Sequence, residues 1–216
     1  LLSMHNLATA YSVVRRYEEA LPLQQRVLDI RRRVLGPDAR ETLITLNEIG
    51  TTHINQQRFD LALPICKEAF ERFHATLGPD HPDTLRAEDS LGGVYWSLKQ
   101  PAKAVPLLEH VLECRSKSYG PDHDLTLSVV SVLGVVYLDA GDPAKGVPMI
   151  QRYVESFGKT KGTDTPIYAT TLYRASQRLF DHDQPADAVP YLRQCLALRQ
   201  QQVPVGVHGH AAAGRL

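Results

Sequence analysis

Cysteine is the most reactive side chain in this sequence, and its three copies are the first candidates for chemistry. They are odd in number and include no CxxC pair, which favours a reducing compartment, and hence the cytoplasm, over a disulfide framework. Cys66 and Cys195 fall at apolar positions of helical segments and are expected in the core. Cys114 is expected to be partly exposed, with no general base beside any of the three. The sequence therefore predicts no catalytic residue and no enzymatic activity.

Metal and phosphate chemistry have weaker candidates. His208–His210 and Asp181–Asp183 could each touch a metal, but neither offers the three or four converging ligands of a real site. Gly158–Thr160 resembles the end of a phosphate-binding loop, yet Tyr153 stands where that loop requires glycine, and no strand precedes it. We therefore predict no metal site and no cofactor.

Composition excludes further classes of function. The chain has 216 residues, with 24 Lys+Arg against 24 Asp+Glu, so it lacks the basic excess that is typical of nucleic-acid binders. The basic run Arg31–Arg33 is expected to be a solvated helix end that complements the helix dipole. The longest apolar stretch, Leu125–Leu138, is shorter than the roughly 20 residues that span a bilayer. Neither a nucleic-acid partner nor a membrane is expected.

The elements that would position any site follow a period of 42 residues. The strongest markers are four glycines and five prolines at this spacing: Gly36, Gly78, Gly120 and Gly162, and Pro22, Pro64, Pro106, Pro148 and Pro190. A fixed period in this range indicates one supersecondary unit that is repeated in tandem and stacks into a solenoid.

Each unit is predicted to contain two helices, because apolar residues recur at helical spacing and proline or glycine marks the ends. The first helices are expected at 1–14, 40–56, 82–98, 124–140 and 165–181, and the second helices at 17–35, 59–77, 101–119, 143–158 and 185–201. The array would then span 1–201, in units of about 1–36, 37–78, 79–120, 121–162 and 163–201, with a disordered tail at 202–216. Leu1 aligns with Leu43 and Leu85, inside first helices, so we expect a fragment of a longer protein.

Several strings carry a family resemblance. The most regular are Leu7-Ala8-x2-Tyr11, Leu91-Gly92-x2-Tyr95 and Leu133-Gly134-x2-Tyr137, each followed by a small residue such as Ala20 or Ala104. They resemble the tetratricopeptide repeat. The longer period, and the string from Leu77 to Leu85, look like the kinesin-light-chain type of that repeat. The resemblance implies an all-α, right-handed superhelical solenoid of about five helix pairs.

The same resemblance implies that the first helices line a concave groove that binds a protein or peptide ligand. The residues expected to contact such a ligand are Asn6, Asn47, Arg86, Asp89, Trp96, Tyr173 and Arg174. Trp96 could be an aromatic anchor or could pack between the third and fourth units. A clamp for a C-terminal carboxylate is not favoured, because only Asn6 and Arg86 fit it and Glu48 would repel the carboxylate.

The predicted function is a non-enzymatic scaffold for protein–protein interaction. The alternative is a regulatory or sensor arm of a larger signalling protein, such as a bacterial kinase or ATPase whose catalytic domain precedes Leu1. Two further alternatives lack their signatures: an enzyme acting through the groove would need a triad, metal cluster or cofactor loop, and an RNA-binding array would need a basic, base-reading groove.

Overall fold

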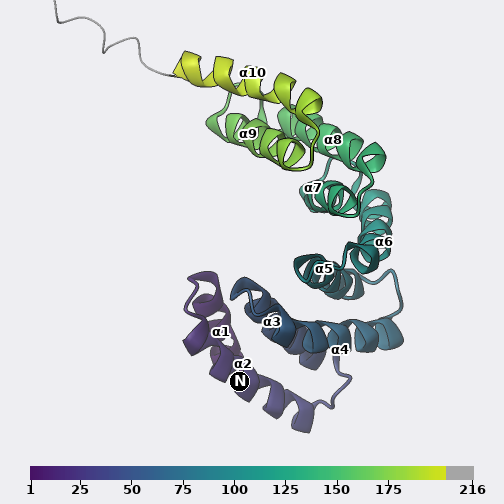
Figure 1. Ribbon diagram of the computed structural model, residues 1–216. Coiled ribbons are helices and arrows are strands. Elements are labelled where there is room, and N and C mark those ends of the chain that lie inside the picture. The colour runs from purple at the N-terminus through teal and green to yellow at the C-terminus, as the bar shows by residue number, and fades with distance from the viewer. Residues whose placement is uncertain (203–216) are drawn as a thin grey trace, which may run out of the picture. The chain divides into compact units, whose positions relative to one another are not determined.

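The computed structural model describes residues 1–202, and every regular element within that range is an α-helix (Figure 1). The ten helices are α1 (Leu2–Val13), α2 (Tyr17–Val34), α3 (Arg40–Asn55), α4 (Phe59–Leu77), α5 (Pro82–Ser97), α6 (Pro101–Tyr119), α7 (Asp124–Asp139), α8 (Pro143–Lys161), α9 (Pro166–Asp181) and α10 (Pro185–Gln202). The all-α repeat fold and the predicted helix pairs are thus confirmed. None of these helices is both long and apolar enough to cross a membrane.

One predicted boundary is wrong by more than a residue. Helix α8 was expected to end near Gly158 but continues to Lys161. Gly158 lies inside the helix, where a Cβ atom would sit 3.0 Å from the ring of Tyr168, so this glycine serves close packing. The helix ends instead at Gly162, whose φ of +85° suits a residue without a side chain. At the other end of the array, the predicted disordered tail lies outside the described residues from position 203 onward, and Gln202 belongs to α10.

The described helices fall into two compact units, Leu1–Val129 and a second unit that begins at Val130, so the division lies within α7. In the first unit, successive helices pack through Leu28, Leu43, Leu46 and Phe73, all nearly or fully buried. In the second unit the corresponding core includes Leu172, which is fully buried. Each helix pair therefore completes its core against its neighbours within the unit, as repeat proteins require.

Small residues set the close approach of the two helices in a pair. A Cβ atom on Gly50 would lie 2.6 Å from Cys66 Sγ, and one on Gly92 would lie 2.9 Å from Leu108 Cγ. Both distances are too short for real Cβ contacts, so a side chain at either position would force the pair apart. The small-residue positions predicted from the repeat are packing contacts.

Prolines inside the second helices are tolerated because they face solvent. Pro22, Pro64 and Pro106 are all exposed within α2, α4 and α6. Each removes one N–H from the helix, and the carbonyl left without that donor can bind water. The repeated proline therefore leaves the helix continuous.

Candidate functional site

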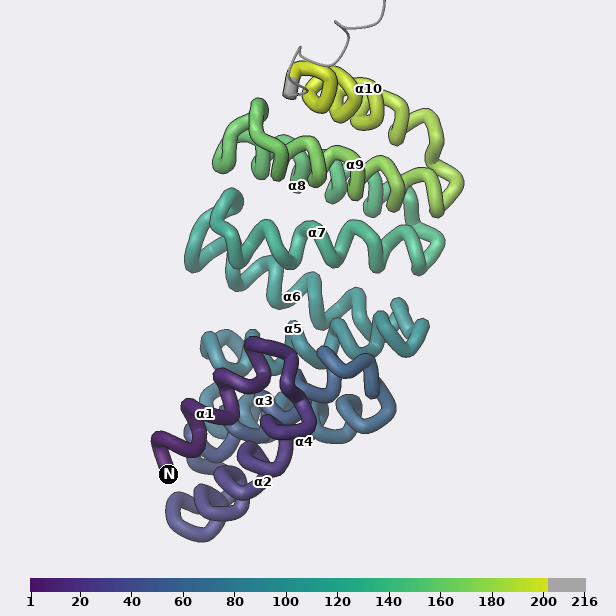
Figure 2. The backbone as a smooth tube through the Cα atoms, turned by 90° about the vertical axis from the view of Figure 1, so that its left-hand side faces the viewer, coloured from purple at the N-terminus to yellow at the C-terminus, as the bar shows by residue number. Residues whose placement is uncertain are grey.

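A pocket of about 310 Å³ lies in the first unit, and first helices supply most of its wall. Figure 2 shows these helices at the purple and blue end of the chain. The lining residues come from α1, α2, α3 and α5: Thr9, Ser12, Val13, Gln24, Asn47, Glu48, Thr51, Thr52, Asn55 and Arg86. We call this set the groove pocket. It brings together Asn47 and Arg86, two of the predicted contact residues, although they are far apart in the sequence.

Two buried polar atoms of residues that line the groove pocket accept no hydrogen bond from the residues that the structure describes. Asn47 is only 4% exposed, and its side-chain Oδ1 has no donor. Glu48 Oε2 is also buried without a hydrogen bond, although His5 Nδ1 lies 3.5 Å away. Burial raises the pKa of Glu48, while the nearby charges of His5, Arg31 and Arg86 act in the opposite direction. These two acceptors are chemically ready for a donor from a ligand.

Arg86 is held at the pocket by a shared carboxylate. Its Nη2 donates to Asp83 Oδ1 at 2.8 Å, and Arg40 Nε donates to the other oxygen, Asp83 Oδ2, at 2.6 Å. Asp83 is buried, whereas about half of the Arg86 side chain (51%) remains exposed. The guanidinium is therefore positioned by the protein and still has donors available to a ligand.

Gln24 is a pocket residue that the sequence analysis missed, because it belongs to a second helix. Its Nε2 donates to Ser12 Oγ at 3.3 Å, and its Oε1 accepts from Thr52 Oγ1 at 3.1 Å. One period later the same position holds Cys66, and two periods later Leu108. The sequence could have indicated this residue, because Gln24 is an amide at a position where the following repeats have apolar side chains.

The other predicted contacts of the first unit are placed differently. Asn6 is exposed on α1 and does not line the groove pocket. Asp89 Oδ2 accepts from Arg115 Nη1 at 2.9 Å, so this carboxylate is engaged within the protein. Trp96 is half-buried on α5 and also lies outside the groove pocket.

A smaller pocket, of about 90 Å³, lies in the second unit. It is lined by Ser131, Ile150, Tyr153, Thr171, Arg174, Ala175 and Arg178. Arg178 Nη1 donates to the carbonyl and the hydroxyl of Ser131, both at 3.2 Å, and burial lowers its pKa. Arg174, a predicted contact, is exposed at this pocket. Its neighbour Tyr173 instead packs its ring beneath the guanidinium of Arg199.

The cysteine predictions are confirmed for two residues and wrong in one respect for the third. Cys66 and Cys195 are buried, and burial raises the pKa of Cys66 to about 12. Cys114 is partly exposed as expected, but His110 Nε2 lies 3.5 Å from its sulfur, so a basic group does stand beside it. Burial and the hydrogen bond to Asp80 raise the pKa of the Cys114 thiol to about 11. The helical spacing of His110 and Cys114 was the signal that the sequence offered.

The basic run Arg31–Arg33 is also not the fully solvated end that was expected. Arg31 is buried and donates to the carbonyl of Glu41 and to the hydroxyl of Thr45. Arg33 is exposed. Arg31 therefore ties α2 to α3 and is a structural residue.

His182, between α9 and α10, is arranged to hold a proton. Its Nδ1 lies 2.7 Å from the carbonyl of Arg178 and its Nε2 lies 3.1 Å from Asp139 Oδ1, so both ring nitrogens face acceptors. Burial lowers its pKa, but these two hydrogen bonds outweigh burial and raise it overall.

This geometry predicts a pH dependence of stability. Because the pKa of His182 is raised by folding, its contribution is complete below the unfolded pKa of about 6.5 and is lost as pH rises through the folded value. We expect the free energy of unfolding to fall between about pH 6 and pH 8, and to fall less in Asp139→Asn. Urea unfolding of both proteins across this range checks it, and equal slopes would contradict it.

Comparisons with known proteins agree with the repeat fold described above. The tetratricopeptide repeat family matches residues 42–117 and 89–157 in one form and residues 1–38 in another. Among curated proteins, none matches the chain. A putative kinesin light chain with nearly identical tetratricopeptide-like repeats from Podosopora anserina is 22% identical, with a TM-score of 0.81 over 94% of this chain and 97% of that one.

Two more distant structures share the fold. BtubC (BKLC) from P. vanneervenii is 14% identical, with a TM-score of 0.75 over 99% of this chain and 85% of that one. A Rap protein, solved in complex with the competence and sporulation factor, is 13% identical, with a TM-score of 0.61 over 92% of this chain and 63% of that one. At these identities the likeness concerns the fold.

Proposed function

Since this chain belongs to the tetratricopeptide repeat family, we propose that it is a non-enzymatic protein–protein interaction scaffold that binds a peptide segment in the groove pocket and acts in the cytoplasm. Proteins of this fold act in general as interaction scaffolds, and such families are generally non-enzymatic. The regulatory-arm alternative, with a linked catalytic domain, gains no support from the comparisons. In this proposal the peptide binds at the groove pocket, and the polar side chains there form hydrogen bonds with it.

The observation that carries the proposal is a pair of buried acceptors at the groove pocket: Asn47 Oδ1 has no hydrogen-bond donor among the described residues, and Glu48 Oε2 faces His5 at 3.5 Å without a hydrogen bond. A buried polar atom without a partner costs about 1–3 kcal/mol, so a ligand that donates to Asn47 Oδ1 recovers that free energy. An extended peptide presents N–H and C=O groups in alternation along its backbone. Its N–H groups fit Asn47, a basic or amide side chain fits Glu48, and its carbonyl or acidic groups fit Arg86.

The second unit supplies a separate cationic contact in this proposal. Arg174 is exposed at a pocket whose other arginine, Arg178, is already bonded to Ser131. An acidic side chain of a ligand would pair with Arg174, because a carboxylate accepts two N–H groups of a guanidinium at once. The Rap complex gives a precedent for ligand binding by this fold.

The test compares peptide capture by the parent protein and by the double variant Asn47→Ala/Arg86→Ala. We expect the peptides retained by the parent on an array to be lost or weakened at least about tenfold, because both a buried acceptor and an anchored donor are removed. Arg33→Ala is the matched control, since Arg33 is an exposed arginine on α2 outside the groove pocket. Circular dichroism verifies that each variant is folded.

Two results would contradict the proposal. One is equal capture by the parent and the double variant. The other is loss of capture with Arg33→Ala alone, which would place recognition on the outer helices. Binding is expected to be moderate at best, because an extended peptide loses conformational entropy when it is ordered.

A further inference from the structure

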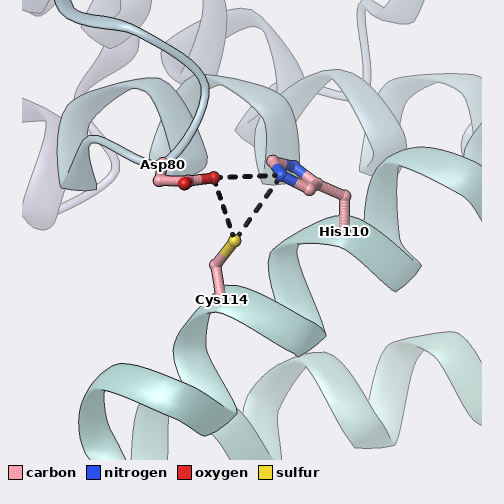
Figure 3. Close-up of side chains that lie close together, drawn as sticks. All are labelled: Asp80, His110 and Cys114. Carbon is pink, nitrogen blue, oxygen red and sulfur yellow. Dashed lines mark hydrogen bonds and ion pairs between the residues drawn. The ribbon is translucent and has the colours of Figure 1, made fainter.

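We propose that Asp80, His110 and Cys114 form a zinc-binding site in the first unit. Figure 3 shows their side chains converging: Asp80 comes from the turn between α4 and α5, and His110 and Cys114 come from successive turns of α6. The four-residue spacing places His110 and Cys114 on one face of the helix. A carboxylate, an imidazole and a thiolate are the three kinds of side-chain ligand that zinc takes in proteins.

The spacing of the three ligand atoms fits a zinc tetrahedron. Cys114 Sγ lies 3.5 Å from His110 Nε2 and 3.4 Å from Asp80 Oδ1, and His110 Nε2 lies 3.4 Å from Asp80 Oδ1. Tetrahedral zinc with usual bond lengths of about 2.0–2.3 Å separates its ligand atoms by about 3.3–3.7 Å. The three atoms thus occupy three corners of one coordination sphere, and the fourth corner remains for water.

A buried carboxylate orients the histidine. Glu88, which is 5% exposed, places Oε2 2.7 Å from His110 Nδ1. This bond makes Nδ1 the protonated nitrogen and leaves the lone pair of Nε2 facing Asp80 and Cys114. Zinc-ligating histidines in proteins are commonly supported by such a carboxylate on the other ring nitrogen, which fixes the tautomer and increases the basicity of the ligand.

The neighbouring repeat acts as an internal comparison. One period earlier, the positions of Asp80, His110 and Cys114 hold Asp38, Glu68 and Arg72. Those three side chains also meet, but as ion pairs: Arg72 contacts Asp38 at 2.8 Å and Glu68 at 3.1 Å. The fold therefore brings these three positions together in both repeats. The position that holds the cation Arg72 in the earlier repeat holds the thiol Cys114 in the later one.

Glu88 also departs from the repeat. The same position one period earlier holds Leu46 and one period later Val130, so an acid stands where its counterparts are apolar. Burying a carboxylate is unfavourable unless it is hydrogen-bonded. It is hydrogen-bonded to His110, the residue that the zinc proposal requires to be oriented. The histidine, the cysteine and their buried support thus occur together in a single repeat.

The alternative chemistry for a cysteine beside a histidine is nucleophilic catalysis, and the surroundings disfavour it. Asp80 lies against the sulfur, and a carboxylate there opposes a thiolate anion. Cys114 lies in the interior of α6, away from a helix N-terminus that would stabilise the thiolate. A divalent cation instead neutralises both Asp80 and the thiolate, and the thiol proton leaves to solvent when the metal binds.

The test is zinc titration of the full chain against a chromophoric chelator. The titrations use a His208→Ala/His210→Ala background, so that the His-Gly-His sequence near the end of the chain cannot contribute. We expect one zinc ion per chain in this background, and loss of that binding in Cys114→Ser. Glu88→Gln, which keeps the shape of the side chain, should weaken zinc binding by about 10–100-fold.

Glu113→Gln is the matched control, because Glu113 adjoins Cys114 on the same helix but pairs with Lys117. Its zinc affinity should equal that of the background protein. Cobalt provides a second measurement: a thiolate-to-cobalt charge-transfer band should appear in the background protein and be absent in Cys114→Ser. Zinc should also protect Cys114 from alkylation, as measured by mass spectrometry.

Three results would overturn the inference. The first is that the background protein binds no zinc, and the second is that Cys114→Ser binds zinc as tightly as the background does. The third is rapid alkylation of Cys114 at neutral pH that zinc does not slow, which would indicate a reactive nucleophile. An unchanged affinity in Glu88→Gln would refute the role assigned to Glu88.

Discussion

Replacement of Phe73 by alanine is expected to destabilise the first unit by about 3–5 kcal/mol. Phe73 on α4 is fully buried and packs in one cluster with Leu28, Leu43 and Leu46. Truncation removes the ring from this cluster and leaves a cavity that helices joined by short turns can only partly close. Urea unfolding followed by circular dichroism measures the loss.

Phe180→Ala is the matched control for this variant. Phe180 lies on α9, and 64% of its surface is exposed. Its truncation should change the free energy of unfolding by no more than about 0.5 kcal/mol, as is usual for surface substitutions. Similar losses in both variants would show that the assigned core is wrong.

The position of Phe73 also shows where the charge of a side chain misleads about its burial. One period before and one period after, the same position holds Arg31 and Arg115. Both arginines are buried, and each uses Nη1 to donate to a backbone carbonyl of the following first helix, that of Glu41 or Leu125. The charge of Arg31 led to the expectation of a solvated helix end, whereas its alignment with Phe73 places it at a buried position. A long side chain whose head finds carbonyl oxygens can replace an aromatic ring in such a core.

The fold could be predicted because its signals are local. Helical spacing, proline near the start of a helix and glycine after its end are properties of short segments, and a fixed period repeats them. Of the predicted contacts, Asn47 and Arg86 meet at the groove pocket because inward positions of successive first helices follow from that period. Asp89 shares this register but is bonded to Arg115.

The side-chain clusters could not be predicted from periodicity alone. The contact of Asp80 with His110 and Cys114 recurs one period earlier, where Asp38 and Glu68 meet Arg72, so the repeat sets the geometry. The period does not predict which side chains occupy these positions, and it therefore gives no metal-ligand set. What the sequence does offer is a set of exceptions: Gln24 and Glu88 occupy positions that are apolar in the neighbouring repeats. Burial of a polar group must be compensated by specific partners. Such exceptions therefore indicate positions where this chain has a side-chain cluster that its neighbouring repeats lack.

Replacement of Gly92 by leucine is expected to destabilise the protein by about 1–3 kcal/mol, because it overpacks the contact between α5 and α6. Even the first atom of a side chain, Cβ, would lie 2.9 Å from Leu108 Cγ and 3.0 Å from its Cδ2. Leu108 is itself fully buried, so it cannot move aside without displacing other core residues. The thermal midpoint, followed by circular dichroism, should fall accordingly.

The adjacent Gly93 separates this packing effect from helix propensity. A Cβ atom on Gly93 would meet nothing within 4 Å, so Gly93→Ala should stabilise α5 by about 0.5–1 kcal/mol through the lower backbone entropy of alanine. Gly92→Ala makes the same change in propensity but adds the clash with Leu108, so it should be the less stable of the two. Equal stability of the two alanine variants, or an unchanged midpoint in Gly92→Leu, would mean that α5 and α6 do not rely on glycine for their close approach. The requirement for a small residue at this point of every repeat, from Ala8 to Gly50 and Gly92, would then have another cause.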